Sequence, residues 1–192
     1  SASADDGMED RGASAERLAD LRAELKRREL DGFIVPLADE HQGEYVAASS
    51  ERLAWVTGFT GSAGLAVVLT DKAAVFVDGR YTLQAEAEVP GDLFEHCPLA
   101  DGPPTAWIAD NLSPGAKLGY DAWLMTPGQV KRYQAACGKA DANLEPVTEN
   151  PLDAVWTERP EPPLSPITIH DQAFAGQTAA DKRTQIADAL RG

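Results

Sequence analysis

Hydrophobic and polar positions form short blocks of two kinds along this 192-residue chain. Short apolar runs rich in Val are typical of buried strands, whereas apolar residues three and four positions apart are typical of helices that pack on a sheet. This pattern predicts strands at residues 33–37, 53–57, 65–70, 74–77, 93–97 and 117–120. It predicts helices at residues 14–30, 81–88, 104–112, 127–137 and 151–156.

Strands and helices alternate along most of the chain, which predicts an α/β fold. Asp71 and Lys72 leave only a tight turn between two strands, so this pair is expected to form an antiparallel hairpin. The later strands alternate with helices. We therefore expect one mixed, mostly six-stranded sheet with helices on both faces. Pro36 predicts that the first strand ends early or lies near an edge of the sheet.

The two ends of the chain are expected to lie outside this α/β domain, which is assigned to residues 14–158. Residues 1–13 are small and acidic and are expected to be disordered. Residues 159–166 contain four prolines, which favour an extended connector, so residues 159–176 are interpreted as a linker. Thr178 and Asp181 resemble a helix cap, and residues 177–192 are interpreted as the truncated start of a second domain.

The composition limits the classes of partner. The formal net charge of −14 disfavours binding to nucleic acid and to anionic membranes. No apolar stretch reaches the ~20 residues that a membrane-spanning helix needs. The 2 cysteines are too far apart for a metal knuckle or a redox pair, which favours a reducing cytoplasm.

The sequence contains no recognisable catalytic motif of its own. His41, His96 and His170 lack the mutual spacing of a hydrolytic metal site. No Gly-x-Ser-x-Gly motif is present, and neither Cys97 nor Cys137 lies in a local motif typical of a catalytic nucleophile. We therefore expect neither catalytic nor metal-binding residues in this chain.

Arg80 is the strongest candidate for a binding residue. Asp78 and Gly79 turn the chain between a strand and a helix, and such a junction can present a guanidinium to a peptide carbonyl or carboxylate. The residues alone favour a simpler role, in which Arg80 pairs with Asp78 to stabilise the turn. His41 is a second candidate, although a solvated loop histidine is the simpler interpretation. Trp123 is a candidate for an exposed contact with another domain or subunit.

One long block carries a family resemblance. Residues 55–85 read WVTGFTGSAGLAVVLTDKAAVFVDGRYTLQA. The block resembles the N-terminal domain of Xaa-Pro aminopeptidases (aminopeptidase P), in the long subfamily with three domains. Shorter blocks agree in the same order, at residues 39–45, 118–121, 149–156 and 159–163. The resemblance runs from Leu18 to Leu190 and departs at Gly43 and Val77, where Ser and Thr are common.

The resemblance implies a creatinase N-like domain of a metallopeptidase, a hydrolase that removes an N-terminal residue preceding proline. Two divalent ions, manganese or zinc, would bind in a separate catalytic domain, so this chain alone would be inactive. It would contribute to the substrate entrance and to a homodimer. Arg80 would recognise the peptide, and His41 is a further candidate for contact with it. Its other partners would be its own middle and catalytic domains, in the cytoplasm. The alternative is a catalytically inactive protein-interaction module of the same fold.

Overall fold

The computed structural model of the chain describes residues 2–36, 44–61 and 64–157. The chain divides into two units, Ser1–Arg159 and Pro160–Gly192, and every element described belongs to the first. The predicted boundary at residue 158, the Pro-rich linker and the final helix lie outside the described residues. These three assignments therefore stay predictions.

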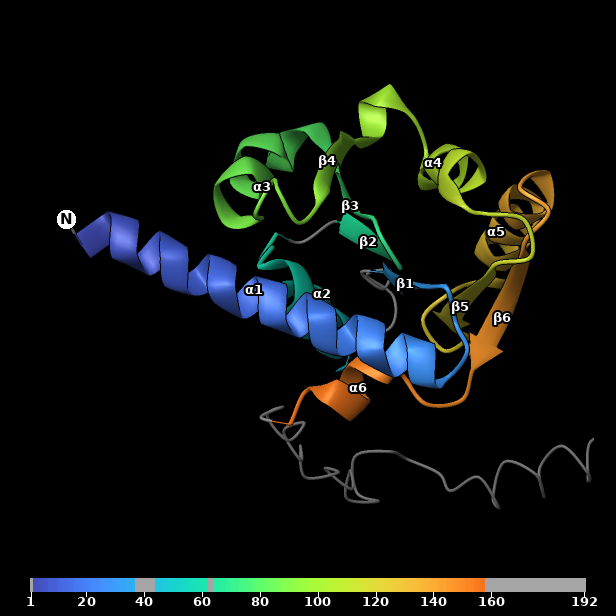
Figure 1. Cartoon of the computed structure of the whole chain (residues 1–192). Coiled ribbons are helices and arrows are strands. Elements are labelled where there is room, and N and C mark those ends of the chain that lie inside the picture. Colours follow the sequence, from blue (N-terminus) through green and yellow to red (C-terminus); the bar gives the residue numbers. More distant parts are fainter. Residues whose placement is uncertain (1, 37–43, 62–63, 158–192) are drawn as a thin grey trace, which may run out of the picture. The chain divides into compact units, whose positions relative to one another are not determined.

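A mixed six-stranded sheet with the order β4-β3-β2-β1-β5-β6 forms the centre of this unit (Figure 1). Strand β2 is antiparallel to both β1 and β3, and the pairs β3–β4, β1–β5 and β5–β6 are parallel. The predicted sheet is confirmed. The strands are β1 (Gly32–Pro36), β2 (Gly64–Leu69), β3 (Ala73–Val77), β4 (Glu95–Pro98), β5 (Lys117–Asp121) and β6 (Asn143–Val147).

Side chains from successive strand residues enter two separate cores. In β3, Val75 and Val77 belong to one hydrophobic cluster and Phe76 belongs to the other. In β1, Val35 belongs to the first of these clusters and Ile34 to the second. This alternation follows from the two-residue repeat of a strand, and it requires apolar cover on both faces of the sheet.

Helices supply this cover on both faces, as predicted (Figure 1). One core contains residues from α1 (Ala2–Arg27), α2 (Glu44–Thr57), α3 (Thr82–Glu88) and α6 (Pro151–Val155). The other contains residues from α4 (Pro104–Asn111) and α5 (Pro127–Lys139). Thr126 begins α5 with a complete capping box to Gln129, which satisfies backbone groups that the first turn leaves unpaired.

Two strand assignments differ from the sequence-based expectation. Residues 53–57 were expected to form a strand but lie at the end of helix α2. Leu53, Val56 and Thr57 are buried at helical spacing, and this periodicity outweighs the strand propensity of a short apolar run. Strand β6 was missed because Asn143, Glu145 and Pro146 interrupt its apolar pattern; a proline is tolerated in this strand because β6 lies at the edge of the sheet.

Helix α1 begins at Ala2 and not at the predicted cap Ser14. Residues 2–13, which were expected to be disordered, are thus helical in the structure, while Ser1 is not described. Ser14 is buried, and Arg11 donates a hydrogen bond to Asp92 in the turn before β4. These contacts hold the helix against the domain one turn before Ser14.

Pro36 ends β1 in the interior of the sheet, which fits the first of the two interpretations of this residue. The backbone of β1 pairs with β2 along its whole length but with β5 only at Gly32 and Phe33. A proline at the last position therefore removes no hydrogen bond from the parallel pairing.

Replacing Leu21 by Ala should strongly destabilise the chain. Leu21 lies in α1 with a side-chain exposure of 0% and belongs to the core that α1 shares with the sheet. Loss of a fully buried leucine costs about 2–5 kcal/mol because a cavity remains. Urea denaturation of Leu21→Ala measures this loss, and Leu83→Ala, at a residue 80% exposed, serves as a control that should change stability by less than about 0.5 kcal/mol. Equal effects of the two substitutions would contradict the assigned core.

Candidate binding edge

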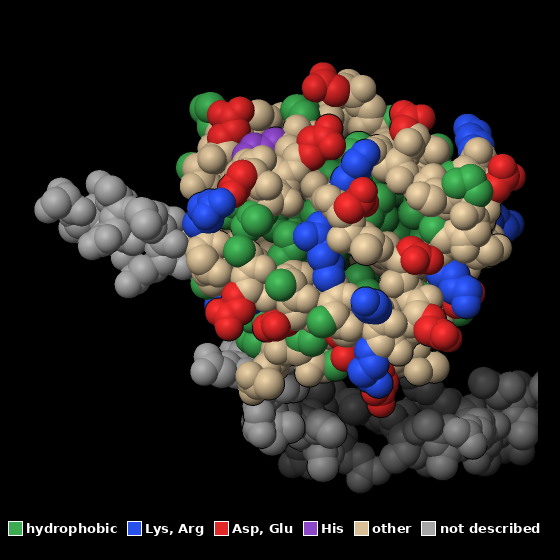
Figure 2. Space-filling model, in the orientation of Figure 1, with side chains coloured by type: hydrophobic (Ala, Val, Ile, Leu, Met, Phe, Trp, Pro, Cys, Tyr) green, Lys and Arg blue, Asp and Glu red, His purple; other side chains and the backbone are tan. Residues whose placement is uncertain are grey.

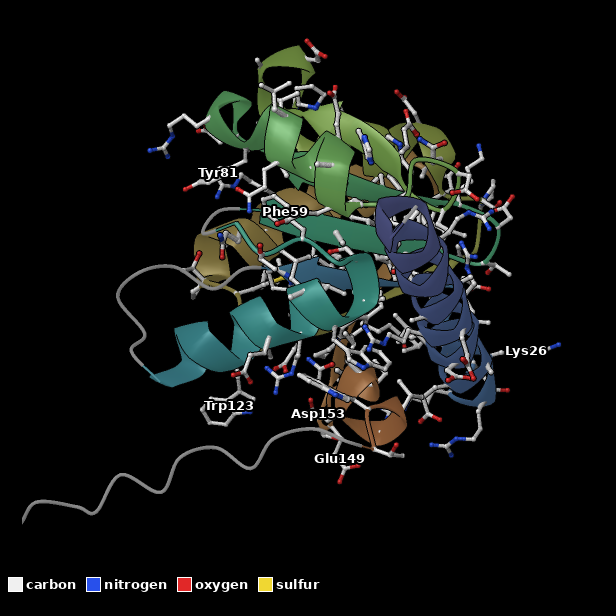
Figure 3. All side chains as sticks on the ribbon, turned by 90° about the vertical axis from the view of Figure 1, so that its left-hand side faces the viewer. Lys26, Phe59, Tyr81, Trp123, Glu149 and Asp153 are labelled. Atoms are coloured by element: carbon white, nitrogen blue, oxygen red, sulfur yellow. The ribbon has the colours of Figure 1, made fainter. Side chains whose placement is uncertain are left out.

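Five of the six strands run in one direction, since only β2 is antiparallel to its neighbours. The carboxyl ends of these five strands therefore lie along one side of the sheet, which we call the binding edge. In α/β folds, ligand-binding residues commonly lie beyond the carboxyl ends of the strands. Arg80 follows β3 at this edge, Trp123 follows β5, and Glu149 follows β6. Figure 3 shows Tyr81 and Trp123 on this side, whereas Lys26 lies on the opposite side.

A short 3-10 helix, Gly79–Tyr81, presents Arg80 at this edge. Asp78 caps the helix: its Oδ1 accepts a hydrogen bond from the backbone N of Arg80 at 3.0 Å. The same oxygen accepts a longer bond, 3.3 Å, from Nε of Arg80. These bonds from Arg80, with the backbone bond as the larger cause, lower the pKa of Asp78. Asp78 thus stabilises the turn, as the sequence suggested.

This pairing leaves most of the Arg80 guanidinium unused. The side chain is 75% exposed, and among the described residues neither terminal nitrogen, Nη1 or Nη2, has a hydrogen-bond partner. Arg27 and Arg52 differ, because each binds both oxygens of a carboxylate through Nε and Nη2. Arg80 therefore retains the pair of donors that can bind a carboxylate or phosphate in bidentate fashion.

The loop before β2 is tied to α3 beside Arg80. Oε2 of Glu88 accepts a bond from the backbone N of Thr60 at 2.9 Å, and Oε1 accepts one from the Thr60 hydroxyl at 2.7 Å. Gln84 donates to Thr60 and to Glu88. Burial alone would raise the pKa of Glu88, but these hydrogen bonds outweigh it and the pKa is lowered.

Gly58 is required where this loop begins. Its φ of +83° is rarely adopted by other residues, and a Cβ atom there would lie 2.8 Å from the carbonyl oxygen of Glu88. The glycine therefore allows the loop to approach α3 closely enough for the Glu88 bonds to form. Conformational freedom therefore explains the glycine at this position.

A second network holds the loop that carries Trp123. The buried carboxylate of Asp121 accepts bonds from the backbone N of Trp123 and from the side chain of Asn150. Asn150 in turn caps α6 through a bond to the backbone N of Leu152. Trp123 is 74% exposed, as expected for a surface contact, and the partner of this contact stays a prediction. Glu149 and Asp153 lie beside the same loop (Figure 3).

The other candidate groups are not arranged for catalysis in the described part of the chain. Burial is the main cause that raises the pKa of both Cys97 and Cys137 to about 11, so both thiols are protonated at neutral pH. His96 lies 3.0 Å from the carbonyl oxygen of Val89. No group of three or more His, Cys, Asp or Glu among the described residues is arranged to bind a metal ion. His41 and His170 lie outside the described residues.

Sequence reasoning missed three residues that shape the edge: Phe59, Glu88 and Asp121. Glu88 carried no local signal, because its partner Thr60 lies 28 positions earlier in the chain. Asp121 resembled any polar residue after a strand, and its partner Asn150 is 29 positions away. On the face that Figure 2 shows, the acidic and basic side chains of the described residues are interspersed.

Residues 17–155 match the model of the creatinase/prolidase N-terminal domain family. The chain belongs to this family. It is 37% identical over 166 residues to Xaa-Pro aminopeptidase 2 of Homo sapiens, an alignment that covers 86% of the chain and 25% of that protein. It is 40% identical over 168 residues to aminopeptidase P2 of Arabidopsis thaliana, which covers 83% of the chain and 24% of that protein. The chain thus spans about a quarter of the length of these curated relatives.

Solved structures support the same family. An X-prolyl aminopeptidase from Caenorhabditis elegans, described as a cytosolic enzyme with a di-nuclear active site, matches with a TM-score of 0.70 and 25% identity. The match covers 93% of the chain and 31% of that structure. The N-terminal domain of a putative metallopeptidase from Corynebacterium diphtheriae has a TM-score of 0.55 at 23% identity, covers 71% of the chain and 98% of that domain, and shares the fold.

These comparisons confirm the family resemblance drawn from residues 55–85. They do not test the roles assigned to Arg80 and His41, which stay predictions. A search for membrane-spanning segments among the described helices finds none that combines the necessary length and apolar character.

Replacing Glu88 by Gln should destabilise the binding edge in a pH-dependent way. Because the folded-state pKa of Glu88 is lowered, its contribution is present above the ordinary carboxyl pKa and is lost as the pH falls through the folded-state value. We expect a loss of about 1 kcal/mol in the free energy of unfolding at neutral pH, shrinking below about pH 4. Urea denaturation from neutral to acidic pH measures the difference, with Glu86→Gln on the same helix as control. A difference that stays constant with pH would contradict the Glu88–Thr60 contact.

Proposed function

We propose that this chain is the non-catalytic N-terminal domain of a metal-dependent Xaa-Pro aminopeptidase, which removes an N-terminal residue preceding proline. The principal support is the 36–40% identity to proteins named Xaa-Pro aminopeptidase or aminopeptidase P over more than four fifths of the chain. The catalytic residues belong to the remaining three quarters of such a protein. The C. elegans relative described as cytosolic supports a cytoplasmic location.

The two divalent metal ions of the proposed enzyme, manganese or zinc, belong to its catalytic domain. The di-nuclear active site of the C. elegans relative supports this assignment. The described residues of this chain do not fit such a centre, because they contain no cluster of metal-ligating side chains. The role that we propose for this domain is to bind and orient the peptide.

Arg80 is the residue of this domain that we assign to substrate recognition. Among the described residues its terminal nitrogens have no hydrogen-bond partner, and a peptide carbonyl or C-terminal carboxylate would supply acceptors for them. Pairing with Asp78 alone does not explain why the terminal nitrogens are unused. Arg27, by contrast, donates from both Nε and Nη2 to the two carboxylate oxygens of Glu24. His41 is a secondary candidate for peptide contact. Trp123 is assigned to contact with the rest of the protein or with a second subunit of a homodimer.

The 192-residue chain by itself should release no amino acid from Xaa-Pro peptides. The complete protein should do so, and a chelator should abolish its activity. The measurement is amino-acid release from a Xaa-Pro tripeptide by both proteins, with and without added manganese or zinc. Activity of the short chain would contradict the proposal. A metal-independent, inactive complete protein would instead favour the interaction module of the same fold.

Replacing Arg80 by Ala in the complete enzyme should lower kcat/KM with little change in melting temperature. Loss of a charge-assisted contact costs about 1.5–3 kcal/mol, which corresponds to about tenfold to a hundredfold in kcat/KM. An exposed ion pair contributes only about 0–1 kcal/mol to stability. Arg27→Ala is the matched control, because Arg27 is also exposed and paired with one carboxylate. Normal kinetics with a much lower melting temperature would show that Arg80 serves only the turn.

A further inference from the structure

The guanidinium of Arg80 lies against an aromatic ring in addition to Asp78. Its central carbon, Cζ, lies 5.6 Å from the centroid of the Tyr81 ring, within the range of a cation–π interaction. Asp78 contacts the guanidinium only at Nε, on the edge opposite to Nη1. Between them, the carboxylate and the ring leave the terminal edge of the guanidinium accessible.

The Tyr81 ring is itself held by the core. It meets the ring of Phe59 edge to face, with centroids 6.0 Å apart and an interplanar angle of 86°. Phe59 is 1% exposed and belongs to the core cluster that contains β1 and β3 residues. Figure 3 shows Phe59 and Tyr81 side by side at the binding edge.

The backbone next to Phe59 is fixed as well. A Cβ atom at Gly61 would lie 2.2 Å from Cζ of the Phe59 ring, so this glycine leaves the space that the ring occupies. The backbone N of Phe59 donates to the Thr57 hydroxyl, and the next residue, Thr60, is bound by Glu88. Tyr81 therefore rests on a rigid support and not on a second exposed side chain.

We propose that Tyr81 is a positioning residue, which holds the Arg80 guanidinium on its ring so that the terminal nitrogens face an acceptor group of the peptide. This inference rests on the proposed substrate role of Arg80. A free arginine samples many rotamers, and binding must restrict them at a cost in affinity. A side chain that is already held on an aromatic surface loses less freedom when the peptide binds. The effect should appear mainly in KM, since it acts on ground-state and transition-state binding alike.

The complete enzyme carrying Tyr81→Leu tests this role. Loss of an exposed cation–π contact should lower kcat/KM about two- to fivefold, mostly through KM. Tyr81→Phe keeps the ring and should retain wild-type values. In an Arg80→Ala background, Tyr81→Leu should cause no further loss, because the group that it positions is already absent. Leu83→Ala, an exposed neighbour on α3, is the matched control.

Thermal melting of each variant separates positioning from folding, and Tyr81→Met, a flexible replacement, is used if Tyr81→Leu does not fold. Additive losses in the double variant would overturn the inference, as would equal losses in Tyr81→Leu and Tyr81→Phe. A defective Arg80→Ala with a normal Tyr81→Leu would refute the positioning role alone. Wild-type kinetics of Arg80→Ala would refute the proposed role of Arg80 itself.

Discussion

Burial of both faces of the central strands is the constraint on which the rest of this domain depends. All five residues of β1 and all five of β3 are buried, with alternate side chains in separate cores. Two layers of helices are therefore required, and α1, α2, α3 and α6 lie opposite α4 and α5. Strands covered in this way can present functional groups only at their ends, where loops connect them to the helices.

The direction of the strands then decides which end is used. Because β2 alone runs against the others, the turns after β3, β5 and β6 are brought to one edge, together with the loop that precedes β2. Separate networks hold these turns: Glu88 binds the loop at Thr60, and Asp121 binds Asn150. The edge is thus a set of short loops anchored to the rigid sheet, which is a suitable platform for a residue that must bind a peptide in one orientation.

Arg80 has a structural role in the turn after β3, and the proposed substrate role would use a different part of the same residue. The backbone N of Arg80 donates a hydrogen bond to the carboxylate of Asp78 and completes the turn. This bond does not depend on the Arg80 side chain. The guanidinium contributes one long bond to the same carboxylate, which is worth little at the surface. Its remaining donors are much stronger when they meet a charged acceptor. The turn therefore constrains where Arg80 lies, and the proposed substrate role would use the donors that the turn leaves exposed.

The amino-acid sequence by itself determined the α/β class, the hairpin around Asp71 and Lys72, the helix after Arg80 and the family, because these depend on local periodicity, turn residues and a contiguous block at residues 55–85. It also located Arg80 at a strand-to-helix junction. Only the tertiary structure decided that residues 53–57 are helical, that β6 exists and that α1 begins at Ala2, since each depends on packing against distant elements. The same holds for the binding edge: Thr60 and Glu88, or Asp121 and Asn150, are far apart in the chain, and strand order alone brings them together.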